Sequence, residues 1–129
     1  MLRQGLLGKE QTIVSHNNCA LKVGSGALEV FATPSMIALM EGAAANSVKN
    51  HLEPGKTTVG VSIDVKHLSA TPLGMMVSCE SELVEVDGKR LVFKITAFDK
   101  KGVIGTATHE RMVVDAKRFM EKAASKKEI

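Results

Sequence analysis

The segment VFATPSMIALMEGAAANSV, residues 30–48, decides how the rest of this chain folds. Thr33-Pro34 is a typical helix start, because threonine caps the free N–H groups of a first turn and proline is favoured at the first helical position. We expect the helix to run from Pro34 to about His51 and to stop before Pro54-Gly55. Its residues are apolar on almost every side, a pattern that predicts a buried central helix.

Beyond this helix the hydrophobic pattern changes from a helical period to alternation, which is typical of strands. The alternating runs cover residues 59–67, 77–83, 91–97 and about 103–114. His67 ends the apolar side of the first run, Asp87-Gly88 is a strong hairpin signal, and residues 10–16 could form a further short strand. The pattern predicts an α+β fold with an antiparallel sheet around a central helix, although a two-stranded or barrel-like arrangement is compatible with it.

The length and composition of the chain indicate one globular domain over residues 1–129. Residues from about 115 to 129 are expected to form a short basic tail helix around Phe119 and Met120. No run of 18 apolar residues occurs, and Met1 to Glu10 lack the apolar stretch of a signal peptide. We therefore expect a cytoplasmic protein with no membrane partner.

The charge and cysteine content argue against two other classes of protein. The formal net charge is +3 with a pI of about 9.0, but the excess is concentrated in the tail. With four Phe, no Trp or Tyr, and no helix-turn-helix, zinc-finger or RNP-like signature, the chain gives no support to a nucleic-acid partner. Cys19 and Cys79 belong to no CxxC pair or Cys/His cluster, so neither a metal site nor a disulfide framework is expected.

Glu41 and His67 are polar residues at positions where apolar ones are expected. A carboxylate in the middle of a buried helix carries a desolvation cost unless it is hydrogen-bonded, paired or protonated, and such groups are often functional. Glu41 could equally be a structural residue bonded to backbone or to a buried partner. His67 could be a core histidine with satisfied hydrogen bonds, or its ring could reach a cleft, because Ser69-Ala70-Thr71-Pro72 ends the strand.

Thr33 and Arg111 are weaker candidates. Thr33 has a structural role as helix cap, and the helix N-terminus also offers N–H groups to a developing oxyanion. Arg111 lies in the charged patch Thr108-His109-Glu110-Arg111 of an otherwise apolar strand. Its guanidinium could clamp a phosphate or carboxylate, or it could pair with Glu110 or Glu41 for structural reasons.

The chain resembles the fluoroacetyl-CoA thioesterase-like group of hotdog proteins over about residues 30–114. The matching segments are Val30 to Glu41, Leu52-Glu53-Pro54-Gly55, Gly60 to His67, Ala70-Thr71-Pro72-Leu73-Gly74 and Thr108-His109-Glu110-Arg111. The resemblance implies a hotdog dimer with active sites at the subunit interface. It also implies an acyl-CoA thioesterase that needs no cofactor, since coenzyme A is part of the substrate.

By the same resemblance, the catalytic set is Thr33, Glu41 and His67. Gly60 would offer its N–H to the thioester carbonyl, and Arg111 would lie near the coenzyme A portion. Eight residues of helix span about 12 Å, so Thr33 and Glu41 of one chain cannot both touch one carbonyl. We therefore expect each site to combine Thr33 of one subunit with Glu41 of the other.

The expected reaction is acyl transfer to water. His67 would act as general base or orient the nucleophile, and Glu41 would either fix the tautomer of His67 or attack the acyl carbon. Thr33, the helix N–H groups and Gly60 would position the tetrahedral centre. The sequence leaves open whether Thr33, Glu41 or water is the nucleophile.

One segment departs from the family pattern. The fluoroacetyl-CoA enzymes carry bulky aromatic residues before the central helix as a lid, whereas Lys22 to Ala27 here read KVGSGA. A short- to medium-chain acyl-CoA is therefore the expected substrate, rather than fluoroacetyl-CoA. The alternatives are a non-catalytic acyl-CoA-binding or sensing module and a hotdog enoyl-CoA hydratase, although hydratases usually use an Asp/His pair at other positions.

Overall fold

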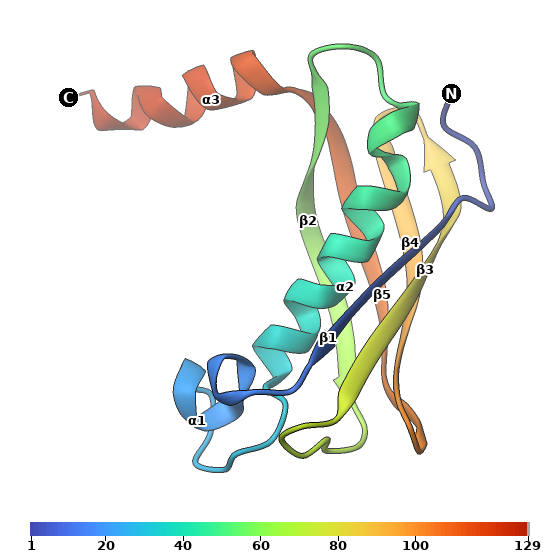
Figure 1. The fold of residues 1–129 in the computed structure, drawn as a ribbon. Helices are drawn as coiled ribbons and strands as arrows, with labels where there is room; N and C mark the ends of the chain where they lie inside the picture. Colours follow the sequence, from blue (N-terminus) through green and yellow to red (C-terminus); the bar gives the residue numbers. More distant parts are fainter. Residues whose placement is uncertain (129) are drawn as a thin grey trace.

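The computed structural model describes residues 1–128 as a curled antiparallel sheet that holds one long helix in its concave face (Figure 1). The strands in this range are β1 (Leu7–Ile13), β2 (Lys56–His67), β3 (Met76–Asp87), β4 (Arg90–Asp99) and β5 (Gly102–Asp115). The α-helices are α1 (Ala20–Val23), α2 (Thr33–Val48) and α3 (Ala116–Ala124). Short 3-10 turns cover His16–Asn18, Lys49–His51 and Ser125–Lys127. The predicted α+β architecture is confirmed.

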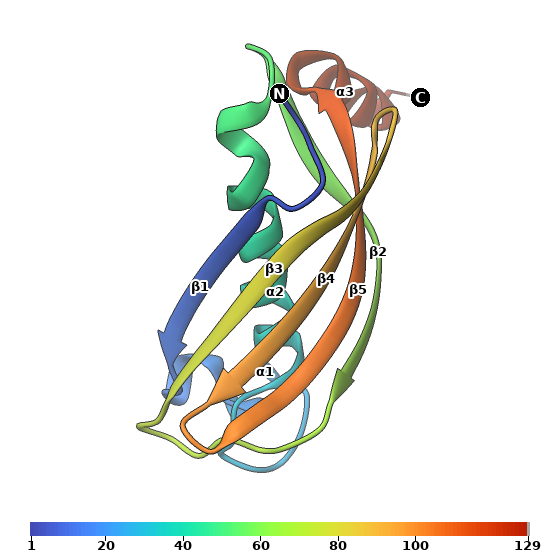
Figure 2. The same ribbon diagram turned by 90° about the vertical axis from the view of Figure 1, so that its right-hand side faces the viewer.

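The strand order in the sheet is β1-β3-β4-β5-β2, and each neighbouring pair is antiparallel. Figure 2 shows the strong twist of the sheet, with α2 behind it. The β3–β4 hairpin turns through Gly88 and Lys89, one residue later than Asp87-Gly88, and Gly88 adopts a φ of 59° there. β1 and β2 form the two edges of the sheet within residues 1–128.

The concave face of the sheet and one side of α2 form the core. The alternation predicted for β3 and β4 is confirmed, since the inward-facing residues of both strands are fully or almost fully buried. They are Val77, Cys79, Ser81 and Leu83 in β3 and Leu91, Phe93, Ile95 and Ala97 in β4. Met36, Met40 and Ala44 of α2 pack against them and have no exposed surface. The sheet therefore fixes which side of α2 faces inward.

A β-bulge interrupts the alternation of β2. Gly60 pairs with Arg111 and Ser62 with Glu110, so Val61 has no partner in β5. A bulge shifts the inward face by one residue. Thr58 is therefore buried in the first half of β2, while His67 points inward at its end. The single apolar face predicted for residues 59–67 was wrong for its first half, where Val61 is 54% exposed.

The structure corrects the prediction for the start of α2. Thr33 is the first helical residue, Ala32 precedes it as the cap, and neither side chain caps the first turn. The Thr33 hydroxyl is directed to a different partner, described below. Pro34 lies in the first turn, where its missing N–H costs nothing.

The structure also corrects the prediction of a helix buried on all sides. Because the sheet covers only one side of α2, Ala38 is exposed and Ile37 and Ala45 are partly exposed. The side chain of Glu41 is 42% exposed. In the single chain, the carboxylate therefore lies at the edge of the core.

The two ends of the chain fit the expectations closely. The first strand begins and ends three residues before the expected 10–16, because Ser15 caps the turn His16–Asn18 instead of continuing the strand. The basic tail, predicted as a helix over about 115–129, forms α3, which is capped by Asp115, ends at Ala124 and projects away from the sheet beyond the β2 edge (Figure 1). Residue 129 of that prediction lies outside the described residues. Among residues 1–128, no helix is long and apolar enough to cross a membrane.

Candidate active site

Thr33 and His67 meet where the start of α2 lies beside the end of β2. Thr33 Oγ1 is 2.7 Å from His67 Nδ1, a hydrogen-bond distance that joins residues 34 positions apart. The rings of His67 and Phe31 are nearly perpendicular, with centroids 6.5 Å apart and an interplanar angle of 82°. A hydroxyl and an imidazole at this distance form the pair that can activate an oxygen nucleophile.

The surroundings of His67 favour its neutral form. Burial lowers the pKa of His67, and a backbone group of Ser69 acts in the opposite direction. His67 Nε2 is buried and has no hydrogen-bond partner within residues 1–128. A neutral imidazole near pH 7 can accept a proton, as a general base must.

An open cleft of about 260 Å³ lies at this pair. Its lining includes Thr33 and His67 together with Ala20, Ser25 and Ala70. Residues 22–27 contribute only the small side chain of Ser25, as the sequence indicated, while Val30 and Phe31, just before α2, also line the cleft. At about 260 Å³ and open to solvent, the cleft has room for a group larger than an acetyl unit beside the Thr33 hydroxyl.

A second polar cluster surrounds Glu41, two turns along α2. A Cβ atom on Gly60 would lie 3.0 Å from Glu41 Oε2 and 3.6 Å from Arg111 Nη1. Arg111 Nη1 itself is 3.9 Å from Glu41 Oε2. Glycine at position 60 thus leaves the space in which the carboxylate lies over the strand.

Arg111 is held by groups of its own chain. It is 7% exposed, and its guanidinium donates from Nε to Thr58 Oγ1 and from Nη2 to the Thr58 carbonyl, each at 2.9 Å. Burial lowers the pKa of Arg111, and the charge of Glu41 raises it. Of the two structural pairings considered from the sequence, Glu41 lies near Arg111, whereas Glu110 binds Arg90.

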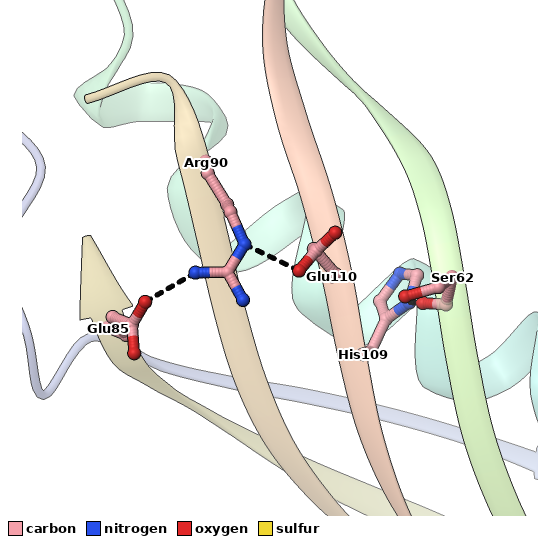
Figure 3. A network of polar contacts seen from close by, with 5 residues as sticks. All are labelled: Ser62, Glu85, Arg90, His109 and Glu110. Atoms are coloured by element: carbon pink, nitrogen blue, oxygen red, sulfur yellow. Dashed lines mark hydrogen bonds and ion pairs between the residues drawn. The ribbon is translucent and has the colours of Figure 1, made fainter. Parts of the chain in front are cut away.

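The sequence reasoning missed His109, which lies between these groups. It is 1% exposed, its Nδ1 is 2.8 Å from the Ser62 carbonyl, and its Nε2 is 3.2 Å from Arg111 Nη1. Figure 3 shows His109 on β5 directed toward Ser62 on β2, apart from the Glu85–Arg90–Glu110 network across β3, β4 and β5. Its sequence signal was its place in the inward alternation with Ala107 and Arg111.

The chain therefore brings its site residues together in two clusters. One consists of Thr33 and His67, and the other of Glu41, Gly60 and Arg111. Eight residues of α2 separate the clusters on the helix, about 12 Å. Seven residues of β2 separate them on the strand, roughly 23 Å. No contact between Glu41 and His67 occurs within residues 1–128 of one chain.

A curled antiparallel sheet around one helix, with this polar site between them, defines a hotdog-fold protein of the thioesterase type. The chain belongs to the family described as fluoroacetyl-CoA-specific thioesterase FlK, whose model matches residues 14–117. The fluoroacetyl-CoA thioesterase of Streptantibioticus cattleyicolor is 42% identical over 98 residues, which cover 76% of this chain and 70% of that protein.

Solved structures agree in sequence and shape. A variant of FlK in complex with fluoroacetate and CoA is 35% identical, with a TM-score of 0.85 over 92% of this chain and 99% of that one. A hot-dog-like protein from Thermanaerovibrio acidaminovorans is 26% identical, with a TM-score of 0.87 over 95% and 91% of the two chains. The predicted fold, family and enzyme class, a thioester hydrolase, are confirmed.

Proposed function

We propose that this protein is an acyl-CoA thioesterase that hydrolyses a short- to medium-chain acyl-CoA in the cytoplasm. The observation that carries the proposal is the 2.7 Å contact between Thr33 Oγ1 and His67 Nδ1 beside an open cleft. Membership of a thioesterase family supports the reaction type, and the relative crystallised with CoA supports the substrate class.

His67 is the general base in this proposal. Its neutral Nδ1 accepts the proton of the Thr33 hydroxyl, or of a water held in the same place, as that oxygen approaches the thioester carbon. The C–S bond then breaks and the proton passes to the leaving CoA thiolate. Where Thr33 is the nucleophile, a water activated by His67 in the same way then cleaves the acyl-threonine ester, which releases the acid and restores the hydroxyl. The N-terminus of α2, which begins at Thr33, supplies positive potential where the carbonyl oxygen becomes negative.

We propose that Glu41 reaches the site from a second subunit. β2 is a long edge strand, and Val61 and the outer side of α2 are exposed beside it. Two copies related by a two-fold axis near the middle of β2 would place the Thr33–His67 cluster of one beside the Glu41–Gly60 cluster of the other. The resulting homodimer would hold two equivalent sites.

The position of the His67 ring limits where that carboxylate can act. When Nδ1 accepts from the Thr33 hydroxyl, Nε2 carries the proton, and a buried N–H without an acceptor is costly. Nε2 has no exposed surface in the single chain, so a carboxylate from the second subunit would lie at the open cleft beside Thr33 Oγ1 and would not bond to this nitrogen. Gly60 of the second subunit would lie beside its Glu41 at the same site, and its N–H would face the thioester carbonyl.

For Arg111 we propose two roles. Its contacts within the chain make it a positioning residue for the Glu41 carboxylate. The interaction with the coenzyme A portion, expected from the resemblance, remains a prediction. Arg111→Lys separates the positioning role from the interaction with coenzyme A. Lysine keeps the positive charge but cannot make the paired Nε and Nη2 bonds to Thr58.

The nucleophile is one of three groups, namely the Thr33 hydroxyl, the Glu41 carboxylate or water. Rapid quenching followed by mass spectrometry distinguishes them. An acyl group on the Thr33 peptide identifies the hydroxyl, one on the Glu41 peptide identifies an anhydride, and incorporation of oxygen from labelled water without either adduct identifies direct attack.

The experiment that tests the function is CoA thiol release from acyl-CoAs of increasing chain length, with fluoroacetyl-CoA included. Thr33→Ala, Glu41→Ala and His67→Ala should each lower the rate by about 10²–10⁴ while leaving the protein folded. Binding of acyl-CoA without turnover would instead establish a binding module. Loss of the double bond of an enoyl-CoA without thiol release would establish a hydratase.

A further inference from the structure

His109 is a buried titratable residue that the proposed chemistry does not use. It lies on the inner face of β5, where its ring packs 6.2 Å from that of Phe93 on β4. Its Cε1 lies 3.4 Å from the position of a Cβ on Gly60. The ring therefore occupies the space between the core and the cluster of Glu41, Gly60 and Arg111.

The contacts of His109 determine its protonation state. Nδ1 faces the Ser62 carbonyl, which can only accept, so Nδ1 carries a hydrogen. Nε2 faces Arg111 Nη1, which can only donate, so Nε2 offers a lone pair. The ring is therefore neutral. The pKa of His109 is lowered, chiefly by burial and also by the charge of Arg111, against the opposite effects of the Ser62 bond and Glu41, which agrees with this assignment.

We propose that His109 is a positioning residue for the thioesterase reaction, which links the bulge of β2 to the guanidinium of Arg111 and thereby sets the place of Glu41. The proposal rests on the proposed function, because the Glu41 carboxylate is assigned a catalytic role there. Two bonds to Thr58 fix Nε and Nη2 of Arg111, and His109 fixes the remaining nitrogen, Nη1, which faces Glu41.

The second contact of His109, its bond to Ser62, joins the ring to β2. Ser62 follows Val61, the residue that the bulge leaves unpaired, and its carbonyl accepts from His109. Gly60, directly before the bulge, faces Glu41. The His109 ring thus holds β2 at Ser62 and the guanidinium of Arg111, the two groups next to the Glu41 carboxylate.

Two substitutions of His109 each keep one of its two hydrogen bonds and remove the other. The amide nitrogen of His109→Asn is two bonds from Cβ, as Nδ1 is, so it can still donate to Ser62 but cannot reach Arg111. The terminal oxygen of His109→Gln is three bonds from Cβ, as Nε2 is, so it can still accept from Arg111. Both place a buried amide in the same cavity, and each is therefore a matched control for the stability of the other.

The test compares kcat, KM and unfolding midpoints of the parent, His109→Asn and His109→Gln. We expect His109→Asn to lower kcat about ten- to a hundredfold with little change in KM, since a misplaced catalytic group affects the chemical step. His109→Gln, which keeps the bond to Arg111 but not the one to Ser62, should lose clearly less of kcat than His109→Asn at a similar unfolding midpoint. Equal losses in the two variants, or a loss that follows the unfolding midpoint, would overturn the proposal.

Nitrogen-15 NMR provides a readout that does not need activity. In the parent, His109 should show a protonated Nδ1 and an unprotonated Nε2, and the Nη1 and Nη2 signals of Arg111 should be separate because its rotation is hindered. The Nη1 signal of Arg111 should keep its position in His109→Gln and shift in His109→Asn, while the Nη2 signal, which reports the bond to Thr58, should stay in place in both. A parent without thioesterase activity would refute the proposed function, whereas the opposite tautomer in His109 would refute this inference alone.

Discussion

Gly60 and His67 lie on the same inner face of β2, although they are seven positions apart in the sequence. Residues seven apart in a regular strand point to opposite faces. The bulge between Gly60 and Ser62 adds the one residue that returns His67 to the inner side. Both polar clusters consequently face α2, one beneath Thr33 and the other beneath Glu41.

Gly60→Ala should lower activity without unfolding the protein. The new Cβ would meet Glu41 Oε2 at 3.0 Å, and the end of this flexible, half-exposed side chain can move aside. We expect kcat to fall about ten- to a hundredfold, because the carboxylate leaves its place. The free energy of unfolding should be unchanged or rise by up to about 1 kcal/mol, since alanine favours the strand more than glycine does.

Gly105→Ala is the contrasting substitution. Its Cβ would lie 2.6 Å from Met36 Sδ and 2.9 Å from the Lys66 carbonyl, so the core and the backbone would have to shift. Chemical denaturation should show a loss of about 1–3 kcal/mol. If Gly60→Ala behaved like Gly105→Ala, the space at position 60 would serve the fold rather than the carboxylate.

Thr33→Val should separate chemistry from stability at the start of α2. The Thr33 hydroxyl caps no N–H group and its main partner is His67, so its removal should cost less than about 1.5 kcal/mol in the free energy of unfolding. Thioester hydrolysis should fall by about 10²–10⁴. Thr106→Val, an exposed position on β5, is the matched control and should leave activity unchanged. Full activity in Thr33→Val would remove Thr33 from the site.

The pH dependence should follow the lowered pKa of His67. Burial holds this pKa below its ordinary value of 6.5, and the neutral ring is the base. The kcat/KM profile should therefore be flat near pH 7 and fall only as the pH drops below about 6.5 toward the lowered pKa. An acid limb centred above pH 7 would contradict this assignment.

The same shift predicts the pH dependence of stability. Between the lowered pKa and 6.5 the unfolded chain binds more protons at His67 than the folded protein does. The free energy of unfolding should therefore decrease as the pH falls through this window. His67→Gln should make the decrease shallower, and denaturant titrations at several pH values measure it.

The parts of the fold that were predictable are those in which periodicity and burial coincide. β3 and β4 alternate regularly over the predicted residues 77–83 and 91–97, and the observed strands extend these runs at their ends. The apolar run of α2 likewise predicted a long helix close to its observed bounds. The bulge in β2 was missed, although a glycine within an alternating strand, Gly60, is a known sign of one. The exposed side of α2 was missed because composition does not show which side the sheet covers.

The candidate site was predictable in its members but not in its arrangement. Thr33, Glu41 and His67 were chosen from resemblance and from polar residues in apolar surroundings. Their division into two clusters depends on the angle at which α2 crosses β2, which no local pattern contains. His109 was missed because a histidine on an inward strand position looks like any core residue until its two partners are known.

Ser25→Phe should narrow the range of acyl chains. Ser25 lines the cleft beside Thr33 and His67, and a phenyl ring there would occupy part of the space left by the small residues of this segment. We expect kcat/KM to fall for longer acyl-CoAs by at least about tenfold and to change little for acetyl-CoA, since the ring removes room for several methylene groups. Ser25→Ala is the control, and equal effects of Ser25→Phe on all chain lengths would show that the acyl group lies elsewhere.

Subunit complementation tests most directly the claim that two chains share each site. Differently tagged Thr33→Ala and Glu41→Ala chains, each inactive alone, would be expressed together and the mixed dimers purified through both tags. Each mixed dimer should contain one site with an intact Thr33 and Glu41 and one with neither, so it should recover about half of the parent activity per dimer. Mixed dimers as inactive as the single variants would contradict the shared site and place Thr33 and Glu41 of one chain in the same reaction centre.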